Sequence, residues 1–366
     1  MKNLTPDISV VMAVYNGEKF LKETLDSILA QTFENFEVII IDDASTDGTA
    51  DILKAYGEKD SRIRILKNQT NMRLAWSLNR AIELARGKYI VRMDADDICL
   101  KDRLKRQFAF MESHPKIDIS FCKFFSLCDG KIIPGGVSRR TDADSIKSML
   151  LFFCPVLHPG VTAKASVMKK YRYDPSHTCS EDIDLWIRMV CDGVNISSSG
   201  DYLMIYRIHE GSVTANSLER QKNEVLQSEK IFYKKMLGGM PKGQENFYIN
   251  GIYFRTDFNK QKLYAFYKYI AAENRKKRSF SKQSTVDAFT EILAEYNREE
   301  GFGVKEIFFV LRFGGLRMVR SLVLKKIRAK KDIKAARRAA AENGFVFKKK
   351  ENGLPTYCLE KKKDEK

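Results

Sequence analysis

The sequence lacks several features that would assign it to a membrane, secreted or dinucleotide-binding class. No apolar run approaches the roughly 20 residues that span a bilayer, and the apolar run near the start has no small-residue cleavage site. The seven cysteines are odd in number and include no C-x-x-C pair, so a disulfide framework is not indicated. Neither G-x-G-x-x-G nor G-x-x-x-x-G-K-[ST] occurs, so neither a dinucleotide fold nor a P-loop is indicated. Together these absences predict a cytoplasmic protein with reduced thiols.

Positive charge is abundant but unevenly placed. The net charge is +17, and residues 301–366 hold 19 Lys and Arg against 7 Asp and Glu, which leaves only +5 for the first 300 residues. Residues 304–328 interleave bulky apolar and basic residues, as an interfacial helix on an anionic membrane does. We therefore expect a peripheral position on the inner face of the cell membrane, with residues 330–338 solvated and mobile. Docking on the rest of the chain is an alternative, and nucleic-acid binding ranks last because no such motif is present.

The first 121 residues alternate between short apolar runs and amphipathic segments. Strands are predicted near residues 8–14, 37–41, 62–66, 88–93 and 117–121, with helices between them. Gly87 follows the third helix and is predicted to take a left-handed conformation there. This order predicts an α/β fold with a parallel sheet covered on both faces. A helix at 143–152, strands at 161–164 and 202–208, and a helical region to about residue 297, interrupted near Gly238, follow.

Three carboxylates stand in four residues at the end of the fourth predicted strand. They are Asp94, Asp96 and Asp97. Mg²⁺ and Mn²⁺ take oxygen ligands, usually one or two carboxylates together with the phosphates of a nucleotide. Because open α/β sheets bind ligands at the carboxyl ends of their strands, the cluster is a candidate metal–diphosphate site. The alternative is a polar turn that caps the next helix.

Five segments resemble, in the same order, the family 2 inverting glycosyltransferases of GT-A fold. They are residues 8–31, 41–49, 71–79, 92–97 and 180–188, and the resemblance extends over about residues 8–212. It implies a GT-A, Rossmann-like mixed sheet with helices on both faces and a helical C-terminal extension. The expected divisions are a catalytic domain at 1–215 (nucleotide half about 1–113, acceptor half about 114–215), a helical extension at 216–300 and the basic amphipathic tail at 301–366.

The resemblance also implies which residues would bind the donor nucleotide sugar. Asp43 would meet the uracil or ribose, unless it caps the next helix. Arg73 stands where the family often has glycine, so it would either contact the base or diphosphate or lie solvated at a helix start. Asp94 would face ribose or metal, and Arg207 would hold phosphate. The full donor set is Val14, Tyr15, Asn16, Asp43, Asn71, Arg73, Asp94 and Arg207.

The same resemblance implies a metal site and a catalytic base. Asp96, with His209, would hold Mn²⁺ or Mg²⁺, and a bound cation neutralises charge on a leaving diphosphate. Asp182 matches the base, whose carboxylate would remove the proton of an attacking acceptor hydroxyl. Glu181, His158 and Trp186 would lie on the acceptor side, although Trp186 also suits packing.

These expectations define a metal-dependent inverting glycosyltransferase. It would move a sugar from a nucleoside-diphosphate sugar, with UDP favoured, to a saccharide hydroxyl on a lipid-linked cell-surface glycan. One alternative is transfer to a polyprenyl phosphate, which Asp182 disfavours because an anionic acceptor needs no base. Another is a non-catalytic scaffold that binds nucleotide sugars. The sugar, base, acceptor, linkage and oligomeric state stay open.

Overall fold

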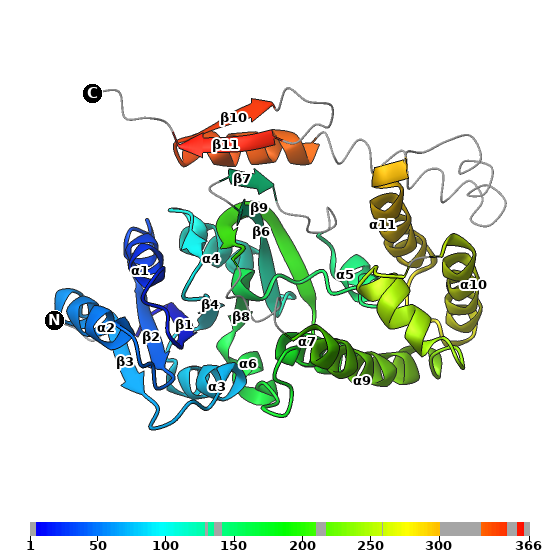
Figure 1. The fold of residues 1–366 in the computed structure, drawn as a ribbon, viewed down its shortest axis with the longest axis horizontal. Helices are drawn as coiled ribbons and strands as arrows, with labels where there is room; N and C mark the ends of the chain where they lie inside the picture. The colour runs from blue at the N-terminus through cyan, green and yellow to red at the C-terminus, as the bar shows by residue number, and fades with distance from the viewer. Residues whose placement is uncertain are drawn as a thin grey trace.

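A single mixed sheet forms the frame of the molecule. The computed structural model describes residues 5–128, 131–134, 141–209, 217–257, 259–300, 331–349 and 357–361. In this part of the chain the strand order is β10-β11-β7-β6-β8-β4-β1-β2-β3, and β9 pairs with both β5 and β6. Figure 1 shows α1, α2 and α3 beside the β1–β3 end of the sheet and α9, α10 and α11 at the opposite side of the molecule.

The strands begin and end as follows: β1 Ile8–Val14, β2 Phe36–Asp42, β3 Ile63–Lys67, β4 Tyr89–Arg92, β5 Ile98–Cys99, β6 Ile119–Cys128, β7 Lys131–Pro134, β8 Val161–Lys164, β9 Ile196–Arg207, β10 Phe345–Lys349 and β11 Tyr357–Lys361. The α-helices are α1 Leu21–Leu29, α2 Thr49–Lys59, α3 Leu74–Leu84, α4 Arg103–Ser113, α5 Ala143–Met149, α6 Ala165–Tyr171, α7 Glu181–Cys191, α9 Leu218–Leu237, α10 Lys260–Lys277 and α11 Lys282–Glu300. A 3-10 turn, η1, covers His158–Gly160, and a π-helix, η2, covers Phe247–Tyr253.

The first four strands are parallel, as the sequence predicted. β1 lies between β2 and β4, and Val10 pairs with Val38 on one side and Val91 on the other. β1, β2 and β4 are buried on both faces because helices cover the sheet, which explains their continuous apolar sequences. Their carboxyl ends reach one edge of the sheet, so Tyr15, Asp43 and Asp94 all follow strands that end there.

The second half of the sheet changes direction. β8 runs antiparallel to both β4 and β6, while β6 runs parallel to β9. The predicted mixed sheet is therefore confirmed. β8 joins the first half to the second, so residues far apart in the sequence are brought to the edge where β4 ends.

Gly87 contradicts the prediction of a left-handed helix end. Helix α3 ends at Leu84, and Gly87 is not among the residues with positive φ. A Cβ at Gly87 would instead lie 2.5 Å from the backbone nitrogen of Ser9. The glycine is needed because β1 passes against it, and its own N–H donates to the Ser9 hydroxyl at 2.9 Å.

The helical extension follows the sequence prediction. α9 ends at Gly238, whose φ of +87° gives a left-handed cap, and Gly239 and Gly243 also have positive φ. Phe232 and Tyr248 of this region share one apolar core with Trp186 of α7. The extension is thus packed onto α7.

The C-terminal residues form a docked unit. A helix covers residues 331–342, and β11 pairs antiparallel with both β10 and β7. Ala336 and Ala340 are fully buried in a cluster that includes Phe125 and Tyr202 of the sheet. Figure 1 shows this unit along the β7 edge. The basic side chains of residues 331–338 are exposed, as predicted, but the helix is docked through Ala336 rather than free of the sheet.

The predicted interfacial stretch, residues 304–328, lies outside the described residues. Among the residues that are described, no helix combines the length and apolar character that crossing a membrane requires.

Candidate active site

Three carboxylates converge where β4 ends. Asp94, Asp96 and Asp97 each offer one oxygen, and these oxygens lie within 4.8 Å of one another. The loop is held from beneath by the Thr24 hydroxyl, which donates to the carbonyls of Ala95 at 2.9 Å and Asp97 at 2.8 Å. The acidic motif seen in the sequence is therefore a spatial cluster.

The cluster carries unfavourable negative charge. Burial, together with the charges of Asp94 and Asp96, raises the pKa of Asp97 well above its ordinary value. Asp97 Oδ1 accepts from the Arg207 N–H at 2.9 Å, but Oδ2 is buried without a hydrogen-bond partner within the described residues. Hard oxygen donors, mutual repulsion and an unpartnered oxygen all suit a divalent cation. The residues present therefore fit Mn²⁺ or Mg²⁺.

Arg207 and His209 close one side of the cluster, as the sequence predicted. Arg207 Nε donates to the Asp96 carbonyl at 2.8 Å, and His209 Nε2 lies 2.9 Å from Asp96 Oδ2. The Arg207 guanidinium also lies 4.4 Å from the ring centre of Phe20 and pairs with Glu23 at 2.5 Å. Phe20 directly precedes α1 and Glu23 lies in its first turn, and neither was predicted as a site residue.

The ends of β1 and β2 are locked together by short polar contacts. The Asn16 side chain accepts from the Thr46 N–H at 2.9 Å, and the Asn16 N–H donates to Ser45 Oγ at 3.0 Å. The Val14 carbonyl accepts from the Asp43 N–H at 2.8 Å. Tyr15 stays 51% exposed. The turn is thus held by hydrogen bonds and exposes the ring of Tyr15, which was expected to contact the nucleotide base.

Asp43 does not cap the helix that follows it. Its carboxylate accepts from Asn68, Ser77 and the backbone N–H groups of Met72 and Arg73, at 2.6–3.0 Å. Helix α2 instead begins after Gly48, without a side-chain cap. Asp43 therefore shapes the loop that carries Asn71 and Arg73.

Arg73 has a backbone conformation that favours glycine. Its φ is +69° and its ψ is 169°, a region that is strained for a residue with a Cβ. The Asn71 side chain steadies this turn by accepting from the Arg73 N–H at 3.1 Å. The Arg73 side chain is exposed at the same edge of the sheet.

The predicted base stands at the first turn of α7. Asp182 Oδ1 accepts from the Ile183 N–H at 2.8 Å, and burial raises the Asp182 pKa. Burial and the Asp182 charge raise the pKa of Glu181 to about 8. Ser180 occupies the cap position but makes no capping bond, because its hydroxyl donates to Glu224 at 3.2 Å.

His158 is held neutral beneath this turn. Its Nε2 lies 2.6 Å from the Tyr173 hydroxyl, and burial lowers its pKa well below the ordinary value. Its Nδ1 is 4.0 Å from Glu181 Oε1. Trp186 is 0% exposed and its ring centre is 6.1 Å from that of His158. The full burial of Trp186 agrees with the packing role that the sequence also allowed, so its side chain supports the site without being exposed in it.

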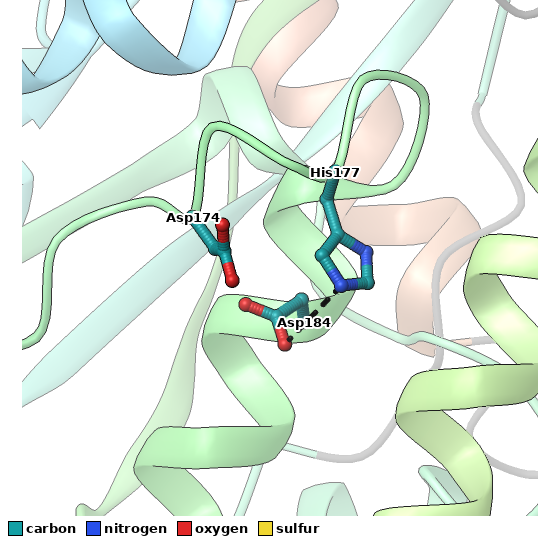
Figure 2. Close-up of side chains that lie close together, drawn as sticks. All are labelled: Asp174, His177 and Asp184. Carbon is teal, nitrogen blue, oxygen red and sulfur yellow. Dashed lines mark ion pairs between the residues drawn. The ribbon is translucent and has the colours of Figure 1, made fainter.

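A second group of metal-type ligands joins the loop before α7 to the first turn of that helix. Figure 2 shows Asp174, His177 and Asp184, with the His177–Asp184 ion pair dashed at 3.9 Å. Arg188 Nε donates to Asp184 Oδ2 at 2.8 Å, so the Arg188 guanidinium already balances the charge of this carboxylate. Glu224 of α9 accepts from the N–H groups of Thr178 and Cys179. These contacts brace the loop that leads to Glu181 and Asp182.

Comparison with known proteins agrees with this arrangement. The family model described as "Glycosyl transferase family 2" matches residues 9–144. An uncharacterized glycosyltransferase of Methanocaldococcus jannaschii is 35% identical over 59% of this chain and 76% of its own length. The UDP-Glc:alpha-D-GlcNAc-diphosphoundecaprenol beta-1,3-glucosyltransferase WfaP of Escherichia coli is 32% identical over 59% and 84%.

The chain belongs to family 2 of the glycosyltransferases. The crystal structure of S. aureus TarS 1-349 with UDP-GlcNAc has the same GT-A fold, with a TM-score of 0.54 at 18% identity, covering 96% of this chain and 99% of that one. The likeness to TarS extends well beyond the 59% of the chain that resembles the two relatives in sequence.

Arg92 links the two halves of this glycosyltransferase electrostatically. Its side chain is 3% exposed, its Nη1 lies against an Asp94 oxygen, and its Nε has no partner within the described residues. Burial raises the pKa values of Asp94, Glu181 and Asp182, and the Arg92 charge opposes the rise in all three. The sequence did carry a signal for it, a lone cation at the end of an apolar strand, but not its reach to Asp182.

Proposed function

We propose that this glycosyltransferase is metal-dependent and inverting, and moves a sugar from a nucleoside-diphosphate sugar to a saccharide hydroxyl. One observation carries the proposal. The acidic cluster of Asp94, Asp96 and Asp97 is closed by Arg207 and His209, and the buried Arg92 that pairs with Asp94 also acts to lower the pKa values of the acid pair at the start of α7. A diphosphate site and a general base in one such neighbourhood suit glycosyl transfer.

The donor would bind at the edge where β1, β2 and β4 end. Tyr15 is exposed for stacking on the base, supported by Val14 and Asn16. Asp43 already accepts four hydrogen bonds, so its main contribution would be to hold the loop that presents Asn71 and Arg73. UDP is favoured because the Escherichia coli relative is named for UDP-Glc.

Asp94 and Asp96 would hold Mn²⁺ or Mg²⁺, with Asp97 and His209 beside them. When bound, such a cation supplies positive charge that stabilises the leaving diphosphate. Arg207 would add a fixed cation next to the same phosphates, because its guanidinium is anchored at the Asp96 carbonyl and on Phe20. The diphosphate would therefore meet positive charge from two directions.

Asp182 would act as the general base. Its carboxylate would take the proton of the acceptor hydroxyl as that oxygen bonds to the anomeric carbon, and the bond from that carbon to the diphosphate oxygen would break on the opposite face. The anomeric configuration therefore inverts. The raised pKa of Asp182 brings it closer to that of a base working near neutral pH. Glu181 and His158 would line the acceptor side.

The acceptor class rests on the relatives and on composition. The Escherichia coli relative is named for a diphosphoundecaprenol-linked sugar, so we propose a lipid-linked glycan of the cell surface as acceptor. The basic amphipathic stretch at 304–328, within the tail 301–366, would hold the catalytic domain (1–215) and its helical extension (216–300) at the inner face of the membrane. Co-sedimentation with phosphatidylglycerol vesicles, weakened by salt, would be the expected signature.

The decisive test measures the melting temperature with UDP-, GDP-, CMP- and dTDP-sugars in Mn²⁺, Mg²⁺ or EDTA. A ligand that binds the native state alone raises the melting temperature. We expect one nucleotide class to do so only with metal, and Asp96→Ala to abolish the shift. Asp51→Ala, which removes an exposed carboxylate from α2, is the matched control. No shift with any donor and metal would contradict the proposal and favour a scaffold.

Transfer to a polyprenyl phosphate is the second candidate, and Asp182 separates the two. A phosphate acceptor is already an anion and needs no base. Asp182→Asn should therefore lower transfer to a hydroxyl acceptor by about 10²–10⁴-fold while keeping the donor-induced shift. Full activity of Asp182→Asn with a phosphate acceptor would support the polyprenyl-phosphate reaction instead.

A further inference from the structure

Helix α4 begins with an arginine that is completely buried. Arg103 is 0% exposed, and Gln107, one turn later on the same face, is also 0% exposed. The two side chains are joined, because Arg103 Nε donates to Gln107 Oε1 at 3.0 Å. α4 thus turns a polar pair into the interior beside the acidic loop.

Burying the Arg103 guanidinium costs free energy, so its presence indicates that its contacts have a role. The hydrogen-bond partners of Arg103 are carbonyl oxygens, an amide oxygen and two sulfur atoms, none of which carries a formal charge. Arginine is rarely buried without a paired carboxylate. As the first residue of α4, Arg103 also lies at the positive end of the helix dipole, where a cation is disfavoured. A methionine would fill the space without either penalty.

The Arg103 guanidinium contacts the acidic loop at both of its ends. Nη2 donates to the Arg92 carbonyl at 2.9 Å, and Nη1 lies 3.1 Å from Met93 Sδ. Nη1 is also 3.5 Å from Cys99 Sγ, whose pKa burial raises, so the sulfur is a neutral thiol. The loop that holds Asp94, Asp96 and Asp97 is enclosed between these anchor points.

The same pair also holds the turn on the acceptor side. Arg103 Nη2 donates to the Pro159 carbonyl at 2.6 Å, and Gln107 Nε2 donates to the Gly160 carbonyl at 2.9 Å. These residues form η1 together with His158, whose ring contacts Tyr173 and faces Glu181. One nitrogen of Arg103 therefore bridges the chain before Asp94 to the turn next to the acid pair.

We propose that Arg103 and Gln107 are positioning residues that fix the acidic loop relative to the acceptor-side turn. The inference rests on the proposed function. The spacing between the acidic loop and this turn matters because the donor and the general base must meet across it. Displacement of reacting groups by about 1 Å can lower a rate about 10²-fold. Neither residue needs to touch a substrate for this role.

The test compares Arg103→Lys, Arg103→Met and Gln107→Met with Lys105→Met, an exposed control on the same helix. Amide hydrogen exchange is measured in the free protein over residues 93–99 and 158–161. We expect exchange to accelerate about tenfold or more in both segments for the Met variants, less for Arg103→Lys, and not for Lys105→Met. Gln107→Met keeps the test decisive if Arg103→Met does not fold.

Two further measurements separate positioning from general instability. The first is the melting-temperature shift with UDP and Mn²⁺, and the second is the rate of UDP release from UDP-glucose by folded protein. We expect Gln107→Met and Arg103→Lys to keep the affinity for UDP within about threefold while the maximal release rate falls about 10–100-fold. A parallel fall in both quantities would mean a merely structural role.

The inference and the proposed function can fail separately. Unchanged exchange in either segment of Gln107→Met would overturn the positioning role, whatever the activity. If the wild type neither binds UDP with Mn²⁺ nor releases UDP, and the wider donor panel is also negative, the proposed function fails. Equal losses in Lys105→Met would likewise overturn the inference.

Discussion

At the scale of single residues, neighbouring carboxylates differ because their surroundings differ. Asp43 accepts four hydrogen bonds and organises a loop, whereas Asp97 is equally buried and keeps one oxygen without a partner within the described residues. A carboxylate with several N–H donors is stable as an anion, and one without them is not. The second kind is the better candidate for a cation site.

The strained backbone at Arg73 predicts opposite effects on stability and binding. Glycine adopts a φ of +69° without a Cβ penalty, so Arg73→Gly should raise the free energy of unfolding by up to about 1 kcal/mol. If the side chain contacts the donor, affinity for the nucleotide sugar should fall about tenfold. Urea unfolding and the donor-induced melting shift measure the two effects.

Arg73→Ala is the matched control for that substitution. It removes the same side chain but keeps a Cβ at the strained position, so it should weaken binding equally without the gain in stability. Unchanged affinity in both variants would mean that Arg73 is a solvated residue at the start of α3.

The pKa of Glu181 predicts a pH dependence of stability. Burial and Asp182 raise it from 4.5 to about 8, so the folded state holds this proton more tightly than the unfolded chain. The resulting stabilisation is present in full below pH 4.5 and is lost as the pH rises through 8. Glu181→Gln should remove a decline of at most about 1.4 kcal/mol per pH unit in that window.

Denaturant unfolding at about pH 5, 6.5 and 8 measures this effect. The wild type should lose more stability than Glu181→Gln between the lowest and highest pH, while Glu58→Gln, at an exposed position of α2, should follow the wild type. Identical curves for wild type and Glu181→Gln would refute the raised pKa.

At the scale of elements, close packing between backbone segments can require a glycine where helix or strand propensity does not. Gly87→Ala would place a Cβ 2.5 Å from Ser9 N and 2.7 Å from Ile8 C, both backbone atoms that cannot rotate away. We expect a loss of about 2–3 kcal/mol in the free energy of unfolding, because β1 must shift against β4.

Gly193→Ala separates this clash from conformational strain. Gly193 has a φ of +85° and nothing within 4 Å of an added Cβ, so only the backbone penalty of about 1–2 kcal/mol applies. Equal losses in the two variants would show that packing between β1 and Gly87 is looser than the structure indicates.

At the scale of the whole molecule, the C-terminal helix stabilises the sheet from its far edge. Ala336 is fully buried against the sheet, and Asp332 accepts from the Tyr202 hydroxyl at 2.9 Å. Ala336→Glu would bury an unpaired charge, so we expect a loss of about 3 kcal/mol or undocking of the helix. Calorimetry and hydrogen exchange of β9 check this. Ala335→Glu, exposed on the same helix, should change little.

The sequence by itself determined the elements whose signals are local. The apolar runs of β1 and β2 predicted parallel strands, and the acidic motif predicted a cluster at the end of β4, because strand periodicity and strand order bring those residues to one edge. Arg207 and His209 were predicted beside that cluster from the family motif alone. The strained backbone of Arg73 was not predicted, because its positive φ appears only in the folded loop.

Only the tertiary structure decided the contacts that join distant parts of the chain. Nothing near Arg103 in the sequence shows that it reaches Pro159, because that contact depends on β8 inserting between β4 and β6. Docking of the tail was only an alternative at the sequence level. The buried face of residues 331–342 is made of alanines, whose weak apolar signal is outweighed by the lysines and arginines between them. The net charge of this segment can be read from the sequence, but which of its side chains are buried depends on the surface it packs against, and that surface forms only when the chain folds.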